Sequence, residues 1–368
     1  MPAKMNKMNF RMVRVIGSGK YSIIYEYKNR KFALKRFFLS EHNAICRALH
    51  ERKILTSLGL GNSTNPFITS LFFATGSWKT PSCICTLGSE YNLNDLVVSV
   101  GLLREEDARF YLSEIICGLE YIHKKNIVHR DIKLKNILLS ETGHAIITDF
   151  DLAHNLLGGG VMKSVIFAGT LDYMAPEIAN RVVVTKKADI WSLGALVAHL
   201  VSPKFRKNAE NIREKLDQAI RGTYEISNAA SLSAELMELI NACLKYDYDA
   251  RPDVENLKTF AFFNSTDWLK VAACQMEPPF KTNQLTFSHI KNFSVDPSHI
   301  NVLMTAFQPN KPILESKSGM YRTSKLHFVP KNIENLEKYG YTDERIQRLF
   351  ENFNFVSPLY KRASIVEN

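Results

Sequence analysis

The N-terminal quarter of the chain carries hydrophobic residues in short runs, followed by a longer stretch at helical spacing. The runs predict strands at 12–16, 23–25 and 31–35. Apolar residues then recur every three or four positions from Ser40, whose hydroxyl suits a helix N-cap, and glycine at Gly59 interrupts them. This region is therefore predicted to be a small, mostly β lobe with one helix.

From about residue 93 the pattern becomes mainly helical. Positions 105–123 form a long amphipathic helix by their spacing, and 188–201 are apolar enough for a buried helix. Two short apolar runs between them, 137–139 and 145–147, predict strands. Beyond residue 263 the chain is richer in Asn, Ser, Lys and Pro, which indicates a partly ordered tail.

Composition narrows the class of protein. The chain has 368 residues, 45% of them hydrophobic, which is enough to build cores and excludes disorder of the whole chain. No run of 18 apolar residues predicts a membrane span, and residues 1–10 do not resemble a signal peptide. Six scattered cysteines without a CxxC pair favour a reduced protein, so we expect a cytoplasmic location, extending to the nucleus.

The net charge of +10 raises the question of nucleic-acid binding. The basic residues are spread along the chain, and no dense Lys/Arg block is interleaved with aromatic residues. Nucleic acid is therefore not an expected partner.

Gly17-Ser18-Gly19, between the first two predicted strands, could hold phosphates on free backbone N–H groups, although such a motif is often only a β-turn. Lys35 on the third strand could clamp phosphates if a carboxylate held it, and Glu51 on the following helix could supply one. The alternatives are an exposed edge lysine and a solvated helix charge. Leu55, one helical turn after Glu51, indicates that Glu51 faces the core.

Residues 129–136, His-Arg-Asp-Ile-Lys-Leu-Lys-Asn, are more specific. Charged side chains crowd between an apolar helix and a strand. Asp131 can accept a hydroxyl proton, and Asn136 offers an oxygen to a hard cation. Asp149 follows the next strand and could bind Mg²⁺ that bridges nucleotide phosphates.

In this order and spacing, the motifs resemble those of the protein kinase family over residues 9–263. The matching positions are Gly17, Gly19, Lys35, Glu51, His129-Arg130-Asp131, Asn136, Asp149-Phe150, Ala175-Pro176-Glu177, Asp189 and Arg251. Lys133 is typical of the serine/threonine class. The resemblance also implies a buried ion pair between Glu177 and Arg251.

Further segments resemble the AGC group of this family. They are Asn9-Phe10, 65–67, 108–111, 167–170, the run from Phe262 to Phe280, and 350–355, which is similar to the AGC hydrophobic motif. Phe355-Val356-Ser357-Pro358 is closest to the ribosomal S-six kinase branch. In that group the aromatic residues of the motif dock on the small lobe, with a disordered tail as the alternative, and a regulatory protein at the tail is a further implied partner.

The resemblance implies an α+β, bilobal protein kinase fold with an AGC-type C-terminal tail. The expected organisation is an N-terminal extension at 1–8, a small lobe at 9–91, a large helical lobe at 92–263 and the tail at 264–368, with its hydrophobic motif at 350–355. The implied activity is transfer of the ATP γ-phosphoryl group to serine or threonine hydroxyls of proteins in intracellular signalling.

The resemblance also assigns site residues. Those expected to bind ATP are Ile16, Gly17, Ser18, Gly19, Lys20, Ile24, Ala33, Lys35, Glu90, Tyr91, Leu138 and Asp149. Asn136 and Asp149 would hold Mg²⁺. Those expected in catalysis are Asp131, Lys133, Asn136, Lys35, Glu51 and Thr170, with Thr170 bracing Asp131 and Lys133.

Several positions depart from the family pattern. Ser22 replaces the third glycine of the phosphate loop, and Asp151 replaces the glycine after Phe150; we expect Asp151 to keep the turn because aspartate tolerates the left-handed conformation. Ile166 and Asn354 stand where AGC kinases carry phosphate acceptors. We therefore expect activity that does not need phosphate at these two positions, and Ser164 is the nearest hydroxyl before Ile166.

Other departures concern the substrate. AGC kinases commonly bind basic substrate residues with acidic side chains. Two of the positions that carry those acidic side chains are Lys135 and His199 here, and Asp95 is a candidate for an acidic residue that is kept. A weaker preference for basic substrates is therefore expected. One alternative function is a catalytically weak, kinase-like scaffold that binds nucleotide and partner proteins. Another is a small-molecule kinase, which the Ala175-Pro176-Glu177 segment and the long tail disfavour.

Overall fold

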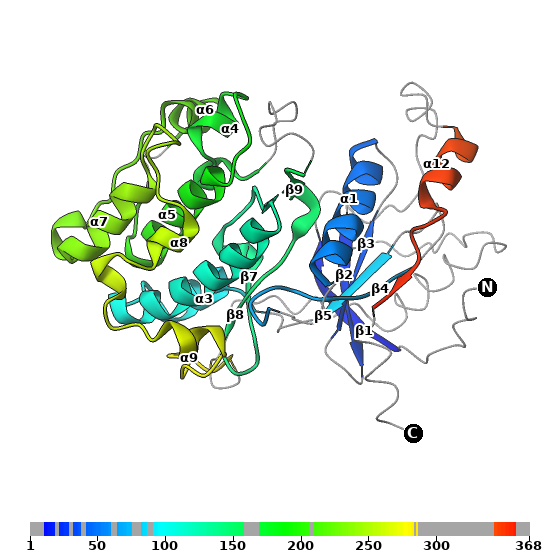
Figure 1. Cartoon of the computed structure of the whole chain (residues 1–368), viewed down its shortest axis with the longest axis horizontal. Helices are drawn as coiled ribbons and strands as arrows, with labels where there is room; N and C mark the ends of the chain where they lie inside the picture. Colours follow the sequence, from blue (N-terminus) through cyan, green and yellow to red (C-terminus); the bar gives the residue numbers. More distant parts are fainter. Residues whose placement is uncertain are drawn as a thin grey trace, which may run out of the picture. The chain divides into compact units, whose positions relative to one another are not determined.

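The computed structural model divides the chain into two compact units. It describes residues 11–18, 22–28, 32–37, 42–59, 65–75, 82–86, 91–157, 169–205, 209–282, 285 and 342–357. The first unit comprises Met1–Leu49, Phe72–Cys85 and Lys291–Asn368, and the second comprises His50–Leu71 and Thr86–Ile290 (Figure 1).

A six-stranded sheet dominates the first unit, in the order β1-β2-β3-β5-β4-β10. The strands are β1 Arg11–Ser18, β2 Ser22–Lys28, β3 Phe32–Phe37, β4 Leu71–Thr75, β5 Ser82–Thr86 and β10 Phe355–Val356. β1–β2 and β2–β3 are antiparallel pairs. The three strands predicted from the N-terminal pattern are confirmed, and β2 is rich in the β-branched and aromatic residues that strands favour.

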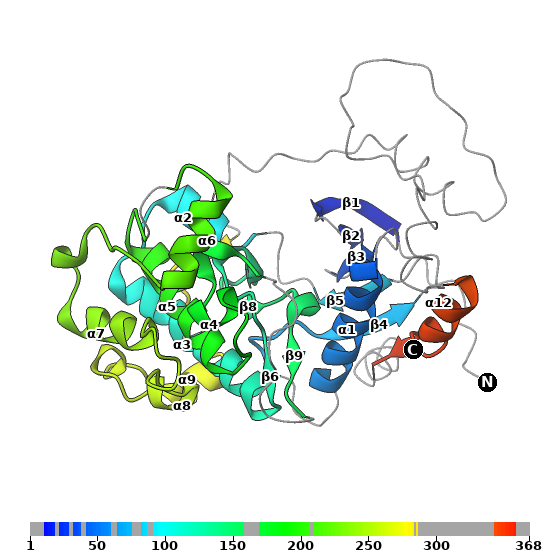
Figure 2. The ribbon, with the colours of Figure 1, turned by 90° about the horizontal axis from the view of Figure 1, so that it is seen from above.

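The C-terminal part of the chain supplies one edge strand of this sheet, β10. α12, Asp343–Phe350, is capped by Thr342, whose hydroxyl accepts a bond from the Arg345 N–H at 3.2 Å. β10 follows and pairs antiparallel with β4 (Figure 2). Phe350 and Phe353 are buried, with their ring centroids 5.2 Å apart.

Helix α1, His42–Gly59, ends at the glycine where the sequence predicts a stop. Ser40, the predicted N-cap, lies outside the described residues. Glu51 and Leu55 are both buried, so the expectation that they share the inward face is confirmed, and the reading of Glu51 as a solvated charge is wrong.

Helices make up most of the second unit. They are α2 Leu93–Val100, α3 Glu105–Lys124, α4 Pro176–Ala179, α5 Lys187–Val201, α6 Ile212–Arg221, α7 Ala234–Cys243, α8 Val254–Leu257 and α9 Trp268–Ala272. Short 3₁₀ turns lie at Leu134–Asn136, Phe150–Leu152, Leu171–Tyr173, Ala229–Ser231 and Ala261–Phe263. The predicted helices at 105–123 and 188–201 are confirmed as α3 and α5.

α5 is buried in the core of this unit. A helix that is apolar on almost all sides is stable only where other elements cover every side of it. Nearly every side chain from Ala188 to Val201 is buried, including Trp191. A Cβ at Gly194 would come within 2.7 Å of the Cys243 Cβ, so glycine lets α5 and α7 approach closely.

Two small antiparallel sheets complete the second unit. β6, Ile127–Val128, pairs with β9, His154–Asn155. β7, Ile137–Leu139, pairs with β8, Ala145–Ile147, as the two apolar runs predicted. This hairpin brings the segments just before β7 and just after β8 to the same end.

The segment after residue 263 continues on the second unit. Val271 of α9 is fully buried and forms an apolar cluster with Phe67 and Cys117. Among the described residues, no helix combines the length and the apolar character that a membrane crossing requires.

Candidate active site

Asp131 lies at the centre of a hydrogen-bond network in the second unit. Its Oδ1 accepts bonds from the Thr170 backbone N–H at 3.1 Å and from the Thr170 hydroxyl at 2.9 Å. Its Oδ2 accepts from Lys133 Nζ at 2.5 Å and from Asn136 Nδ2 at 3.0 Å. Four donors thus converge on one carboxylate and fix the direction of both of its oxygens.

Thr170 connects this carboxylate to the lysine beside it. Lys133 Nζ donates to Thr170 Oγ1 at 2.9 Å, and the same hydroxyl donates to Asp131. The expected contacts of Thr170 with both residues are present.

Asp189 of α5 holds the backbone of this loop. Its Oδ2 accepts from the His129 N–H and its Oδ1 from the Arg130 N–H, both at 2.8 Å. Arg130 has φ of +69°, a left-handed conformation that costs energy for a non-glycine residue. The fully buried Asp189 carboxylate offsets that cost and places Asp131 immediately after the turn.

Hydrogen bonds also set the ionisation of Asp189. Burial by itself would raise its pKa, but bonds from the His123 ring at 2.9 Å and the His129 N–H lower the pKa below its ordinary value. The carboxylate is therefore charged at neutral pH and is a strong acceptor for the loop.

Asn136 and Asp149 lie at one end of the β7–β8 hairpin. Asn136 precedes β7, Asp149 follows β8 after one residue, and the Thr148 N–H donates to the Asn136 carbonyl oxygen at 3.0 Å. Asn136 Nδ2 donates to the Asp131 carbonyl oxygen at 2.9 Å, which turns Oδ1 to the other side of the amide. An amide oxygen and a carboxylate are a donor set that fits Mg²⁺.

The turn after β8 differs from the expectation in one respect. The left-handed residue is Asp149, with φ of +68°, and Asp151 lies in the 3₁₀ turn Phe150–Leu152 with negative φ. Asp151 therefore needs no tolerance of a left-handed conformation, and the reason expected for its acceptability is wrong. The position simply does not require glycine.

Arg251 and Glu177 form the expected buried ion pair. Arg251 Nη1 and Nη2 donate to the two Glu177 carboxylate oxygens, each at 2.8 Å. This pair fixes α4, which begins at Pro176.

In the first unit, strand register aligns three residues expected to bind nucleotide. Gly17 of β1 lies opposite Ile24 of β2, and Ile24 lies opposite Lys35 of β3. Lys35 is half-buried, with Nζ 5.3 Å from the ring centroid of Phe37. Ile16 and Ser18 flank Gly17 on β1. Because Lys35 and Glu51 belong to different units, their ion pair stays a prediction.

Other expected nucleotide contacts are placed in part. The Leu139 N–H donates to the Tyr91 carbonyl oxygen at 2.9 Å, so Tyr91 and Leu138 are neighbours in the second unit. Ala33 lies on β3, opposite Glu26. Gly19, Lys20 and Glu90 lie outside the described residues, as do Ser164 and Ile166.

Comparison with known protein families identifies the family to which the chain belongs. Residues 10–263, more than half of the chain, match the protein kinase domain family. The chain belongs to the protein kinase family.

The chain is similar to ribosomal S6 kinases and SCH9, which are AGC-group kinases. It is 34% identical to ribosomal protein S6 kinase beta of Caenorhabditis elegans over 291 residues, 75% of this chain and 52% of that protein. It is 29% identical to human ribosomal protein S6 kinase alpha-3 over 296 residues, 76% of this chain and 38% of that protein. Saccharomyces cerevisiae SCH9 is 27% identical over 90% of this chain and 42% of its own length. The chain spans about half the length of the first of these relatives, and less of the other two.

The structure shows the surroundings of the three positions where AGC kinases commonly bind basic substrate residues. Lys135 is exposed in the turn before β7. His199 of α5 packs between aromatic rings, 4.7 Å from Tyr173 and 5.2 Å from Phe205 between centroids. Asp95 accepts the Asn92 N–H at 3.1 Å in a capping box of α2, so helix capping already accounts for this aspartate.

Two histidines near Arg130 were not anticipated. His50 of α1 and His154 of β9 stack with ring centroids 6.5 Å apart, and His50 Nε2 contacts the Ala153 carbonyl oxygen. Burial lowers the pKa of both rings, and the Arg130 charge lowers it further. The signal in the sequence was weak, because 104 positions separate the two residues.

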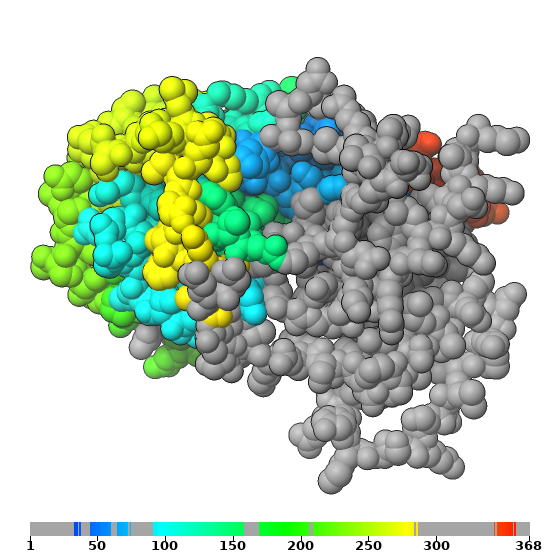
Figure 3. All heavy atoms as spheres, turned by 90° about the horizontal axis from the view of Figure 1, so that it is seen from below, coloured from blue at the N-terminus to red at the C-terminus, as the bar shows by residue number. Residues whose placement is uncertain are grey.

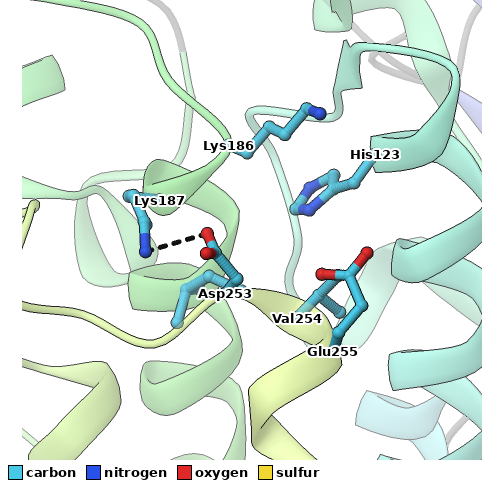
Figure 4. Close-up of a pocket in the computed structure, with 7 residues that line it drawn as sticks. His123, Lys186, Lys187, Asp253, Val254 and Glu255 are labelled. Carbon is cyan, nitrogen blue, oxygen red and sulfur yellow. Dashed lines mark ion pairs between the residues drawn. The ribbon is translucent and has the colours of Figure 1, made fainter.

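His123, at the end of α3, was also missed. It bonds Asp189 and lines a pocket with Lys186, Lys187 and residues 253–255 (Figure 4). Lys187 Nζ lies 2.9 Å from Asp253 Oδ1, so charges of opposite sign are paired there. None of the lining residues is among those expected for catalysis.

Proposed function

We propose that this chain is a serine/threonine protein kinase that transfers the γ-phosphoryl group of ATP to protein hydroxyls in intracellular signalling. The observation that carries this proposal is the Asp131 carboxylate, held by Lys133, Thr170 and Asn136 at 2.5–3.1 Å. A site of this kind works mainly by positioning and by stabilising charge.

The residues of the second unit have distinct roles in this proposal. Asp131 orients the substrate hydroxyl and accepts its proton as the oxygen attacks phosphorus. Lys133 stabilises negative charge on the transferred phosphoryl group, and Thr170 keeps Asp131 and Lys133 aligned.

Asn136 and Asp149 would hold Mg²⁺ through an amide oxygen and a carboxylate. Protein kinases generally use ATP with Mg²⁺, and when bound the ion neutralises charge on the β- and γ-phosphates. The hydrogen bonds of Asn136 to Asp131 keep the metal ligand and the general base in one rigid loop.

The ATP-binding residues proposed for the first unit are the aligned Gly17, Ile24 and Lys35, with Ile16, Ser18, Gly19, Lys20 and Ala33 beside them. Lys35 binds the α- and β-phosphates in this proposal, and the buried Glu51 carboxylate holds Lys35. Glu90, Tyr91 and Leu138 complete the adenine pocket.

We propose that residues 264–368 are an AGC-type tail whose hydrophobic motif binds its own small lobe. The burial of Phe350 and Phe353 and the pairing of β10 with β4 support this. A regulatory protein that contacts the tail remains part of the proposal. We also propose a cytoplasmic location, extending to the nucleus, which a fluorescent fusion would test; the six cysteines scattered along the sequence without a CxxC pair support it.

A peptide library tests the proposed function. The purified full chain should transfer phosphate from ATP to serine and threonine peptides when Mg²⁺ is present, and mass spectrometry should locate the phosphate on the hydroxyl residues. Chelation of Mg²⁺ or the Asp149→Asn substitution should abolish transfer. Absence of transfer by the unmodified chain with Mg²⁺ would contradict the proposal.

A further inference from the structure

Three side chains that metals favour meet on the second unit, away from the residues assigned to catalysis. Glu114 belongs to α3, His144 lies immediately before β8, and Cys274 follows α9. One ligand atom from each lies within 4.8 Å of the other two. α3 packs against both β8 and α9, and Figure 1 shows the three elements next to one another.

The carboxylate is held in a fixed orientation. Glu114 Oε1 lies 2.6 Å from His144 Nδ1, and Oε2 accepts the Ala145 N–H at 2.8 Å. The Glu114 side chain has no exposed surface, and the Phe110 ring lies 5.9 Å from the His144 ring between centroids. Partners of this kind hold ligand side chains in place before a metal arrives.

The thiol is fixed by the packing of α9. The Cys274 N–H donates to the Val271 carbonyl oxygen at 2.8 Å, and Cys274 packs against the cluster of Phe67, Cys117 and Val271. Its backbone has φ of +57°, which is unfavourable for cysteine and is maintained here by the surrounding structure.

We propose that Glu114, His144 and Cys274 form a Zn²⁺ site with water as the fourth ligand. Tetrahedral Zn²⁺ with bonds of about 2.0–2.3 Å separates its ligand atoms by roughly 3.3–3.6 Å. That spacing is longer than the 2.6 Å between Glu114 Oε1 and His144 Nδ1 and shorter than the 4.8 Å within which all three ligand atoms lie, so small side-chain rotations would bring them to it. Nitrogen, oxygen and sulfur together suit Zn²⁺, whereas Mg²⁺ and Ca²⁺ prefer oxygen alone.

The charges of the proposed ligands balance the charge of Zn²⁺ at this partly buried site. One carboxylate and one thiolate neutralise the two charges of Zn²⁺, and the imidazole binds as a neutral ligand. The Cys274 thiol loses its proton to solvent when the metal binds.

The bound metal would fasten the segment after α9 to the β7–β8 hairpin. These segments already touch: Thr282 Oγ1 donates to the carbonyl oxygens of Ser140 at 3.0 Å and Glu141 at 2.8 Å. A Cβ at Gly143 would lie 2.0 Å from the Phe280 carbonyl oxygen, so the two backbones are in close contact. In Figure 3 the yellow segment lies along the cyan and green surface of this unit.

The test is a titration of metal-stripped full chain with Zn²⁺, with excess Mg²⁺ present to occupy weaker oxygen sites. Calorimetry should show one tight site per chain, and Co²⁺ should give a near-ultraviolet thiolate-to-metal band. Cys274→Ser should remove the band and weaken Zn²⁺ binding by about 100-fold or more. Cys46→Ser, at an exposed cysteine on α1, is the matched control and should keep both.

A second variant separates loss of a ligand from loss of fold. In His144→Asn the amide can still bond Glu114 but offers no imidazole, so Zn²⁺ binding should weaken while Tm without metal changes little. Zn²⁺ should raise the Tm of the unmodified chain and of Cys46→Ser only. Equal Zn²⁺ affinity in the unmodified chain, Cys274→Ser and His144→Asn would overturn the proposal, as would the absence of tight binding in the unmodified chain. None of these readouts depends on phosphoryl transfer.

Discussion

Arg251 and Glu177 face each other through two parallel hydrogen bonds of 2.8 Å, and neither side chain is more than 4% exposed. Arg251 also donates to the carbonyl oxygens of Lys187 at 3.0 Å and Lys245 at 2.7 Å. The guanidinium thus holds together the start of α5, the segment just after α7 and, through Glu177, α4.

Loss of the carboxylate in this pair should destabilise the second unit strongly. Glu177→Gln leaves a buried guanidinium without its counter-charge, so the free energy of unfolding should fall by about 3–5 kcal/mol. Urea denaturation measures this free energy of unfolding. Glu344→Gln removes half of an exposed pair on α12 and is the control, which should show no measurable change. Equal stability of the two variants would contradict the structural role of Glu177.

The Thr170 hydroxyl should matter for catalysis more than for folding. Thr170→Val removes the bridge between Lys133 and Asp131, and hydrogen bonds to charged groups contribute about 1.5–3 kcal/mol. We therefore expect kcat to fall roughly 10- to 100-fold. Thr170→Ser keeps the hydroxyl and should retain most of the rate. If valine and serine behave alike in steady-state kinetics, the bridge has no catalytic role.

His50 and His154 should make the protein less stable in mild acid. Burial lowers their folded pKa values below the ordinary histidine pKa of about 6.5, so the unfolded chain binds more protons just below that pH. The stability they contribute is complete above about pH 6.5 and is lost as the pH falls through their folded pKa values. His154→Asn should flatten the dependence of the unfolding free energy on pH in this window. An unchanged slope would exclude this linkage.

The pairing of β10 with β4 should depend on the buried phenylalanine rings of the C-terminal segment. Phe353→Ala should weaken the pairing of β10 with β4, because truncation of a buried phenylalanine costs about 3–5 kcal/mol where the site cannot collapse. Hydrogen exchange at Ser357, whose N–H donates to the Phe72 carbonyl oxygen at 2.8 Å, reports this directly. Asn354→Ala, at the exposed neighbouring position, should leave the exchange rate as it is.

Substrate selection should respond to the charge at position 135. We propose that the exposed Lys135 would repel an arginine placed before the acceptor, so peptide arrays should show weak selection for arginine two residues before the target hydroxyl. Lys135→Glu should strengthen that selection, whereas Lys245→Glu, at an exposed lysine after α7, should not. Strong arginine selection by the unmodified chain would refute this account.

Much of the fold follows from local patterns. The amphipathic spacing of α3 and the apolar character of α5 indicate helices over their length, and the short apolar runs of β7 and β8 favour strands because they are too short for helices. The order of Asp131, Asn136 and Asp149 was informative because the β7–β8 hairpin lies between Asn136 and Asp149 and brings its two ends together.

Contacts between distant segments could not be predicted in the same way. Cys274 lies 160 positions from Glu114, and no periodicity relates a residue after α9 to one inside α3. The left-handed residue after β8 was predicted at Asp151 from its side-chain type, whereas in the structure it is Asp149. Backbone conformation there depends on tertiary contacts of the loop and not on propensity alone.

The most direct measurement is the kcat of Mg²⁺-dependent phosphoryl transfer by the unmodified chain and by Asp131→Asn, with ATP affinity measured in parallel. Loss of the general base should lower kcat by about 10²- to 10⁴-fold while ATP affinity stays close to that of the unmodified chain. Asp217→Asn, at an exposed aspartate of α6, should have unchanged kcat. Transfer by Asp131→Asn at the unmodified rate would contradict the central role of this carboxylate.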